Sequence, residues 1–255
     1  MKKNRYSVPA LEKAIVIIES LSQSKHPLGI TDLYALCGLP KSSIFMILNT
    51  LEDLQYVAKL EGDKYSLTLK VYNLGMAVLS KLNVRELARP YMEALAEELR
   101  FTVHLAKLEH DKAMYIEKVS GPGFVQFSTV VGQSWPLYIS AGGKVLAAYM
   151  SEEQLSAVLE SCTFESFTPN TITSEEAFRE LLQSVREQQY AFEDEEGELG
   201  IRCVAAPVFD DTGKAVAALS VTALRNELPI HKVLDVSAAL RRKALLISQQ
   251  LGYPL

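Results

Sequence analysis

Residues 39–57, LPKSSIFMILNTLEDLQYV, are the most informative about the fold of the first part of this chain. Pro40 suits the first turn of a helix, and Ile44, Leu48 and Leu51 then recur at helical spacing. This pattern predicts a helix with one buried stripe, to which Ile47 also belongs. The side chains left on its outer face are Ser42, Phe45, Met46 and Asn49.

A shorter helix precedes this one, and residues 11–21 predict a further helix by the same apolar spacing. In the shorter helix, Leu33 and Leu36 are expected to face inward. Thr31 is predicted to cap its start, and Gly38 supplies the turn that ends it. Two helices separated by a turn that contains Gly form a helix-turn-helix. A small helical bundle used for protein contacts is the alternative.

Two strands are predicted at residues 56–60 and 64–67, joined by a hairpin turn at residues 61–63. This hairpin would form a wing beside the helix that follows Pro40, where DNA phosphates would lie. Tyr65 is expected on the same surface. The residues expected to contact DNA are Lys41, Ser42, Ser43, Phe45, Met46, Asn49, Lys59 and Lys64. Phe45 and Met46 carry no charge for phosphates, so they pack either on thymine methyl groups or against the wing.

Length and composition predict two folded domains and a connector. The chain has 255 residues, of which 48% are hydrophobic and 22% charged, as in ordinary globular proteins. The net charge of −5 is unevenly spread, because residues 1–80 hold nine Lys and Arg against seven acids. The first domain is therefore slightly positive and the rest carries −7, which fits DNA binding at the front.

No feature of the sequence predicts export, a membrane segment, a metal site or a cofactor. The basic start is not followed by an apolar stretch, and no apolar run approaches the roughly 18 residues of a spanning helix. Cys37, Cys162 and Cys203 lack CxxC spacing, and the four His lack metal-ligand spacing. We therefore expect a cytoplasmic protein.

The remainder of the chain predicts an α+β domain. Residues 69–82 form a connecting helix, and residues 84–101 form a strongly periodic one that contains Pro90. The later strands are predicted at residues 102–109, 113–119, 124–130, 201–209 and 214–223. The later helices are predicted at residues 140–150, 151–162, 174–189 and 230–251.

Several features of this second domain allow two interpretations. The small residues Ala141 and Gly142 open a helix whose N–H groups either attract a carboxylate or form a tight turn. Cys203 has no evident general base, so a structural or ligand-lining role is favoured over a nucleophile. Residues 193–196 are predicted to be a solvated loop, from which Glu193 could turn into a pocket. Phe127 and Trp135 are core aromatics or pocket walls.

The last two strands predict a ligand-binding patch. If Phe209 pairs with Lys214, then Cys203 lies opposite Ser220. Ile201 then lies opposite Thr222, and these side chains share one face of the sheet. A one-residue bulge would change this register. Two hydroxyls and a thiol on one patch, which the helix start at residues 140–144 could cover with free N–H groups, would suit a small carboxylate.

These segments together resemble the IclR family of bacterial regulators over nearly the whole chain. Residues 10–21 (ALEKAIVIIESL) and 39–57 are similar to the family's first and recognition helices. The other similar segments are residues 65–75, 88–90, 132–149 (GQSWPLYISAGGKVLAAY), 168–173 (TPNTIT) and 200–213 (GIRCVAAPVFDDTG). The chain departs from the family in carrying Met46 where Arg is common, Ala141 where Gly is frequent and Glu193 where Asp is frequent.

The resemblance implies an amino-terminal winged helix-turn-helix (1–68), a linker helix (69–83) and a GAF-like effector-binding domain with an antiparallel sheet (84–255). It also implies a homodimer or homotetramer on double-stranded operator DNA, controlled by a small carboxylate or aromatic acid. The effector residues expected are Phe127, Trp135, Ala141, Gly142, Glu193, Ile201, Cys203, Ser220 and Thr222. The alternatives are an enzyme acting on a carboxylate through Cys203 or the Gly142 helix, and a protein-interaction adaptor.

Overall fold

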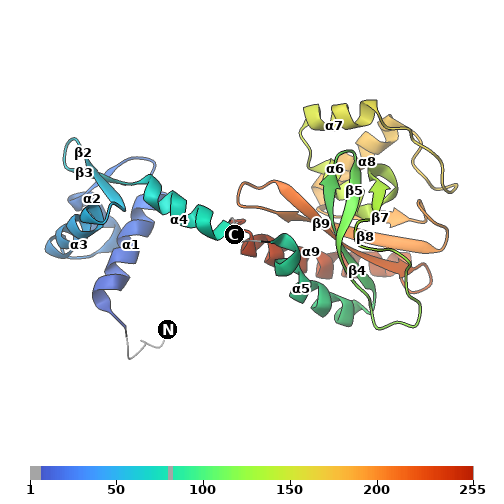
Figure 1. The fold of residues 1–255 in the computed structure, drawn as a ribbon, viewed down its shortest axis with the longest axis horizontal. Coiled ribbons are helices and arrows are strands. Elements are labelled where there is room, and N and C mark those ends of the chain that lie inside the picture. The colour runs from blue at the N-terminus through green and yellow to red at the C-terminus, as the bar shows by residue number, and fades with distance from the viewer. Residues whose placement is uncertain (1–6, 80–82, 255) are drawn as a thin grey trace. The chain divides into compact units, whose positions relative to one another are not determined.

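A computed structural model describes residues 7–79 and 83–254, which divide into two compact units, Met1–Lys81 and Leu82–Leu255 (Figure 1). The amino-terminal unit has helices α1 (Pro9–Gln23), α2 (Ile30–Cys37), α3 (Lys41–Asp53) and α4 (Leu69–Leu79). Its strands β1 (Leu28–Gly29), β2 (Val57–Leu60) and β3 (Lys64–Leu67) form an antiparallel sheet in the order β1-β3-β2. This is a winged helix-turn-helix.

Local sequence accounts for the turn between α2 and α3. Gly38 adopts a left-handed φ of 67°, and its N–H donates to the Tyr34 carbonyl at 2.9 Å. The prediction that Thr31 caps this helix is wrong, because α2 begins at Ile30 and its N-cap residue is Gly29. Instead, the Asp32 carboxylate accepts the Gly29 N–H at 2.8 Å, which satisfies a donor at the helix start.

One small core holds the amino-terminal unit together. Ile17, Leu33, Ile44 and Leu48 are fully buried in it, and Tyr65 of the wing joins them at 2% exposure. Tyr65 therefore packs the wing onto the helices and does not face phosphates. The inward position predicted for Leu36 is also wrong, since its side chain is 64% exposed: it follows the buried stripe by sequence spacing but lies at the solvent edge of α2.

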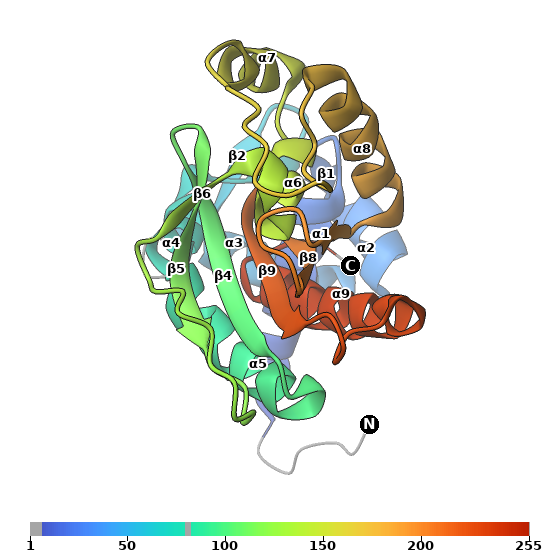
Figure 2. The same ribbon diagram turned by 90° about the vertical axis from the view of Figure 1, so that its right-hand side faces the viewer.

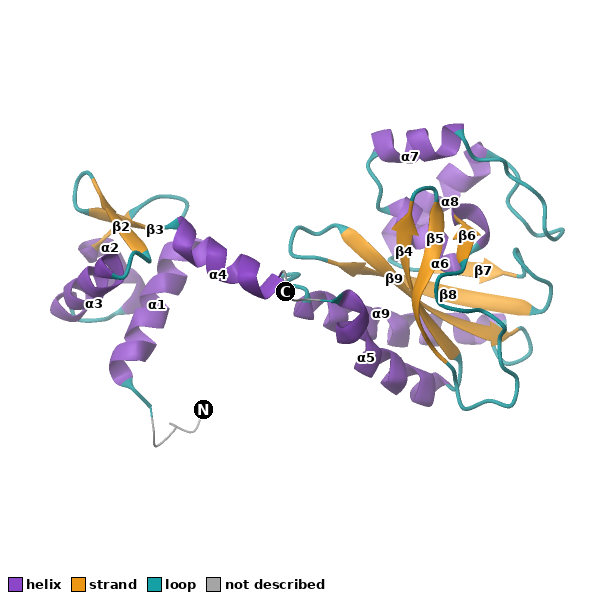
Figure 3. Cartoon of the chain, in the orientation of Figure 1, coloured by secondary structure: helices purple, strands orange, loops and turns teal. Residues whose placement is uncertain are grey.

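The carboxy-terminal unit is a six-stranded antiparallel sheet in the order β6-β5-β4-β9-β8-β7 (Figure 3). Its strands are β4 (Thr102–Glu109), β5 (Lys112–Val119), β6 (Ser134–Pro136), β7 (Ala191–Asp194), β8 (Ile201–Phe209) and β9 (Ala215–Leu224). Its α-helices are α5 (Val84–Leu99), α6 (Ala141–Ala148), α7 (Glu152–Glu160), α8 (Glu175–Gln188) and α9 (Val233–Gln250). Short 3-10 helices lie at Leu137–Ile139 and Ile230–Lys232.

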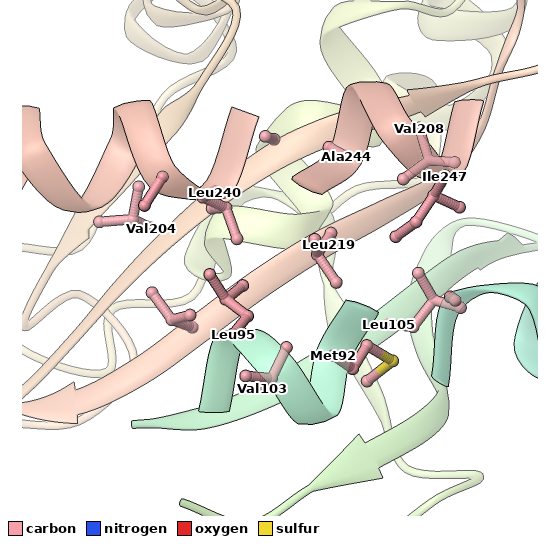
Figure 4. Close-up of a cluster of buried hydrophobic side chains, with 14 of the residues drawn as sticks. Met92, Leu95, Val103, Leu105, Val204, Val208, Leu219, Leu240, Ala244 and Ile247 are labelled. Carbon is pink, nitrogen blue, oxygen red and sulfur yellow. The ribbon is translucent and has the colours of Figure 1, made fainter. Parts of the chain in front are cut away.

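Helices cover both faces of this sheet. Helices α5 and α9 lie on one side and α6 and α8 on the other (Figure 2). Alternate residues of β8 explain this arrangement: Val204 lies beside Leu240 of α9 and Val208 beside Ile247 (Figure 4), whereas Ala205 belongs to the core on the α6 side. Nearly continuous apolar strands such as β8 and β9 are what a sheet covered on both faces requires.

The register of β8 and β9 differs from the prediction but preserves the shared face. A bulge lies between Val208 and Phe209, and Cys203 pairs with Thr222 where Ser220 was expected. Ile201 accordingly pairs with Leu224. The displacement is two residues, and side chains alternate with a period of two, so every side chain keeps its face.

The strand predicted at residues 124–130 is absent from the structure; this described segment is a loop. The Lys118 ammonium donates to the carbonyls of Phe127 at 2.6 Å and Thr129 at 2.7 Å. The Gln126 amide donates to the Gly123 carbonyl at 2.8 Å. Side chains thus take the carbonyls that strand pairing would use, and β6 pairs with β5 instead.

The solvated loop predicted at residues 193–196 is also wrong. Residues 191–194 form edge strand β7, and Glu193, Glu195 and Glu196 are between 2% and 8% exposed. Charge alone suggested solvent, but the hydroxyls of Thr168 and Thr171 and backbone N–H groups hold this turn in place. Within the described residues, no helix has the length and apolar character needed to cross a membrane.

Candidate DNA-reading helix and effector cavity

The predicted outer face of α3 is confirmed. Phe45 is 48% and Met46 61% exposed, Ser42 is exposed and Asn49 is partly exposed. Ile44 and Leu48, on the opposite side, are fully buried. The helix therefore presents a face of apolar and small polar side chains, which can contact base edges and carries no charge to attract phosphates.

The charged groups around this face are sparse. Lys41 is exposed, with its ammonium 5.6 Å from the centre of the Tyr34 ring and 3.4 Å from the Thr31 hydroxyl. Ser43 is partly buried beside it. Glu52 and Asp53 lie at the other end of α3. The first turn of α3 is thus the end that favours an anion.

Both predicted wing lysines are paired within the chain. Lys59 lies 2.7 Å from Asp63, and both side chains are well exposed. Lys64 lies 2.5 Å from Asp32, and this hydrogen bond lowers the pKa of the Asp32 carboxyl. Lys64 therefore ties the wing to the start of α2, whereas Lys59 pairs within the wing turn. Both pairs are exposed, so either lysine can exchange its partner for a phosphate at little cost.

The carboxy-terminal unit contains a cavity of about 420 Å³ on the α6 side of its sheet. Its floor includes Tyr115 of β5, Cys203 of β8 and Thr222 of β9, and the loop at residues 125–129 lies across it. This volume and mixed lining are typical of small-molecule sites. Among the described residues that line it, none is Lys or Arg.

The structure brings most of the predicted effector residues together in this cavity. The ones that line it are Phe127, Trp135, Glu193, Ile201, Cys203 and Thr222. The other predicted residues, Ala141, Gly142 and Ser220, are buried outside its lining. A side chain added at Gly142 would meet Ala106 and Ala218 of the sheet at 3.6 and 3.8 Å, so Gly142 faces the sheet and not the cavity.

The start of α6 favours the tight-turn interpretation over a free anion site. A Cβ at Gly143 would lie 2.5 Å from the Leu137 carbonyl oxygen, so only glycine fits there. The Ser140 hydroxyl accepts the Gly143 N–H at 3.1 Å and itself lines the cavity. Lys144, fully buried behind it, pairs with Glu196 and donates to the Phe192 carbonyl.

Glu193 is the buried carboxyl of the cavity. Its side chain accepts the N–H groups of Glu196 at 2.5 Å and Gly197 at 3.2 Å. Burial nevertheless raises its pKa to about 7, despite these hydrogen bonds and the charge of Lys144. Glu193 therefore changes its protonation state near neutral pH.

A chain of polar contacts crosses the cavity floor. The Cys203 sulfur lies 3.4 Å from the Thr222 hydroxyl, which lies 3.4 Å from Nδ1 of His104. Nε2 of His104 lies 2.7 Å from the Thr129 hydroxyl, and its ring stacks on Tyr115. Burial lowers the pKa of His104 to about 3 and raises that of Cys203. The imidazole is thus neutral and the thiol protonated.

Comparison with known families identifies the chain. Residues 76–249 match the bacterial transcriptional regulator IclR C-terminal domain, and residues 10–61 match the IclR helix-turn-helix domain. The chain belongs to the IclR family. Members of this family bind DNA and respond to small-molecule effectors.

Known relatives match this chain over nearly the whole length of both proteins. The chain is 34% identical to the HTH-type transcriptional regulator XynR of Escherichia coli, over 97% of this chain and 98% of XynR. It is 35% identical to KdgR of the same organism, over 99% of this chain and 96% of KdgR. The crystal structure of the Agobacterium tumefaciens repressor BlcR has the same fold, with a TM-score of 0.85 and 23% identity, covering 98% of this chain and 99% of BlcR.

In this IclR-family chain, sequence reasoning missed Tyr115 and, apart from Phe127, the loop at residues 125–129 as parts of the cavity lining. It also missed His104, which lies behind this lining and contacts Thr222. The alternation of β4 could have placed His104 beside Thr102, on one face with the β9 hydroxyls. No local sequence pattern could have placed this loop over the sheet, because it is held by hydrogen bonds from side chains of another segment, such as Lys118.

Proposed function

We propose that this IclR-family chain binds a pseudo-palindromic operator as a homodimer or homotetramer and is controlled by an effector in the 420 Å³ cavity. The cavity carries the effector part of this proposal, because it places the polar groups of Glu193, Cys203 and Thr222 beside aromatic walls. The winged helix carries the DNA part.

Residues 1–68 would contact DNA, 69–83 would link and 84–255 would hold the effector. On DNA, Ser42, Ser43, Phe45, Met46 and Asn49 would face the major groove. Lys41 and Lys59 would contact phosphates, and Lys64 would do so only by leaving Asp32. Effector binding would change the fraction of molecules whose two winged helices fit both half-sites.

We infer a small organic acid as the effector. No Lys or Arg stands among the described lining residues, which include the exposed Glu198 at the solvent side as well as the buried Glu193, so an ionised Glu193 would repel a carboxylate. With a pKa of about 7, Glu193 can be protonated and donate to the ligand. The acid would thus bind with uptake of a proton, and its affinity would fall as the pH rises through about 7. A neutral polyhydroxylated molecule is the second candidate, favoured by the same lack of cations.

The sole tryptophan offers a direct test, because Trp135 lines the cavity. Aliphatic hydroxy acids, benzoates and matched neutral polyols would be titrated against its fluorescence, near pH 6 and near pH 8. An acid that binds more tightly at the lower pH supports the proposal. Saturable binding of polyols alone, without pH dependence, would transfer it to the second candidate.

Thr222→Val and Ser220→Ala form a matched pair of variants. Both residues lie on β9 with the same facing, but only Thr222 lines the cavity. Thr222→Val should weaken the binding of the acid and Ser220→Ala should not. If both variants bind equally well while the acid still quenches Trp135, the ligand does not contact the β9 hydroxyl.

An enzyme is not favoured. Burial keeps the Cys203 thiol protonated, and His104 contacts Thr222 and Thr129, not Cys203. A nucleophilic cysteine needs an adjacent base and a lowered pKa. The similar regulator BlcR is described as a repressor, and we propose repression of a metabolic operon in the cytoplasm. Mapping the chromosomal fragments that the protein retains, with and without the acid, would test this.

A further inference from the structure

The outer face of α3, formed by Ser42, Phe45, Met46 and Asn49 and called the reading face below, carries no charged side chain. The helix has no Arg, and Lys41 is its single cation. The bidentate contact of Arg with guanine is therefore unavailable from this helix, and Lys41, which we assign to a phosphate, is its only side chain able to replace it. What remains to contact bases is Ser42, Phe45, Met46 and Asn49.

The exposure of Phe45 and Met46 decides between the two interpretations that the sequence allowed. Neither residue belongs to the core of the winged helix, to which the wing contributes Val57 and Tyr65. With 48% and 61% of their surfaces exposed, they do not pack against the wing. Two large apolar side chains thus stand free on the helix that enters the major groove.

These side chains form one patch with Asn49. Positions three and four residues apart are neighbours on a helix, so Asn49 lies beside both Met46 and Phe45. Asn pairs with the N6 and N7 atoms of adenine, and apolar side chains contact the C5-methyl group of thymine. Both preferences are for the same base pair.

We propose that α3 reads A·T pairs in each half-site, with Phe45 and Met46 packed on thymine methyl groups and Asn49 hydrogen-bonded to an adjacent adenine. This proposal rests on the DNA-binding function proposed above. Glu52 and Asp53 at the far end of α3 disfavour phosphates there, which leaves the Lys41 end to enter the groove.

The first experiment needs no knowledge of the operator. Full-length protein would select binding sites from a randomised duplex library, and the best site would be remade with deoxyuridine for thymidine in each half-site. We expect enrichment of A·T pairs at the half-site centres. Removing one contacted methyl group should weaken binding about fourfold, the effect of exposing one buried methyl-sized group.

Variants assign this effect to residues. In Phe45→Ala and Met46→Ala, the affinities for the thymine and uracil sites should converge. Leu54→Ala is the matched control, because Leu54 is 51% exposed at the end of α3 but lies away from the reading face. It should retain the full thymine preference. Thermal melting of each variant would verify that it is folded.

The outcomes separate this proposal from the function on which it rests. Sequence-specific binding that is equal on thymine and uracil sites, or selected sites rich in G·C, would overturn the thymine assignment and leave a DNA-binding regulator. Failure to select any sequence, with retention that is insensitive to salt, would overturn both.

Discussion

The reading face of α3 and the 420 Å³ cavity differ in how far their side chains are exposed to solvent. Met46 is 61% exposed, whereas Glu193 is 2% exposed. The side chains of α3 are positioned by one helix, but those of the cavity come from several strands and a loop. A change on α3 should therefore alter DNA binding and spare stability, whereas a change around the cavity should alter both.

Two lysine–acid pairs give this comparison its strongest test. Lys144 is fully buried and pairs with Glu196, whereas Lys59 pairs with Asp63 at the surface. Lys144→Met should destabilise the carboxy-terminal unit by about 3–5 kcal/mol, because it leaves a buried carboxylate unpaired. Urea unfolding followed by Trp135 fluorescence would measure this.

Lys59→Met is the control for that experiment and should leave unfolding unchanged, since exposed pairs contribute little. An unaltered midpoint for Lys144→Met, or a similar loss for both variants, would contradict the contrast between the two regions.

The next effect concerns pH. The pKa of Glu193 is raised by burial from 4.5 to about 7, so the folded state binds a proton that the unfolded state releases. This contribution to stability is present below about pH 4.5 and is lost as the pH rises through about 7, a change of about 3 kcal/mol. Glu193→Gln keeps an oxygen for the N–H groups of Glu196 and Gly197. It should be more stable than the wild type near pH 8.

Unfolding of both proteins across this pH range would give the difference curve, which cancels the contribution of Glu196, whose pKa is also raised by burial. A flat difference curve would show that Glu193 titrates normally in the folded protein.

On the exposed side of the comparison, Asn49→Ala should weaken specific DNA binding by about 1–3 kcal/mol, the value of one good base contact. Binding to random DNA and the unfolding midpoint should stay the same. Leu54→Ala is the control, because Leu54 is exposed at the end of α3 and lies away from the reading face. Equal losses on operator and random DNA would remove Asn49 from base reading.

The smallest expected effect is at the wing. Asp63→Asn removes the partner of Lys59, and Asn tolerates the positive φ of 54° found at this position. DNA affinity should rise slightly at low salt. Lys59→Ala should lower the slope of log affinity against log salt by about one. A fall in affinity for Asp63→Asn would show that Lys59 does not contact phosphate.

Features with local causes could be predicted from the amino-acid pattern alone. Helical spacing placed Ile44 and Leu48 inward and Met46 outward, and Gly38 marked the end of α2. Strand β8 was predicted with its observed bounds, and the shared face of Cys203 and Thr222 was correct despite the wrong register. These features depend on backbone geometry within one or two elements, so a periodic pattern is enough to specify them.

The position of the cavity and the groups that it contains could not be predicted in this way. The β8–β9 bulge, the loop at 125–129 held by Lys118, and the burial of residues 193–196 all depend on contacts between distant segments. The acidic run suggested solvent because charge favours water. It is buried because Lys144, Thr168 and Thr171 supply partners that no local pattern reveals.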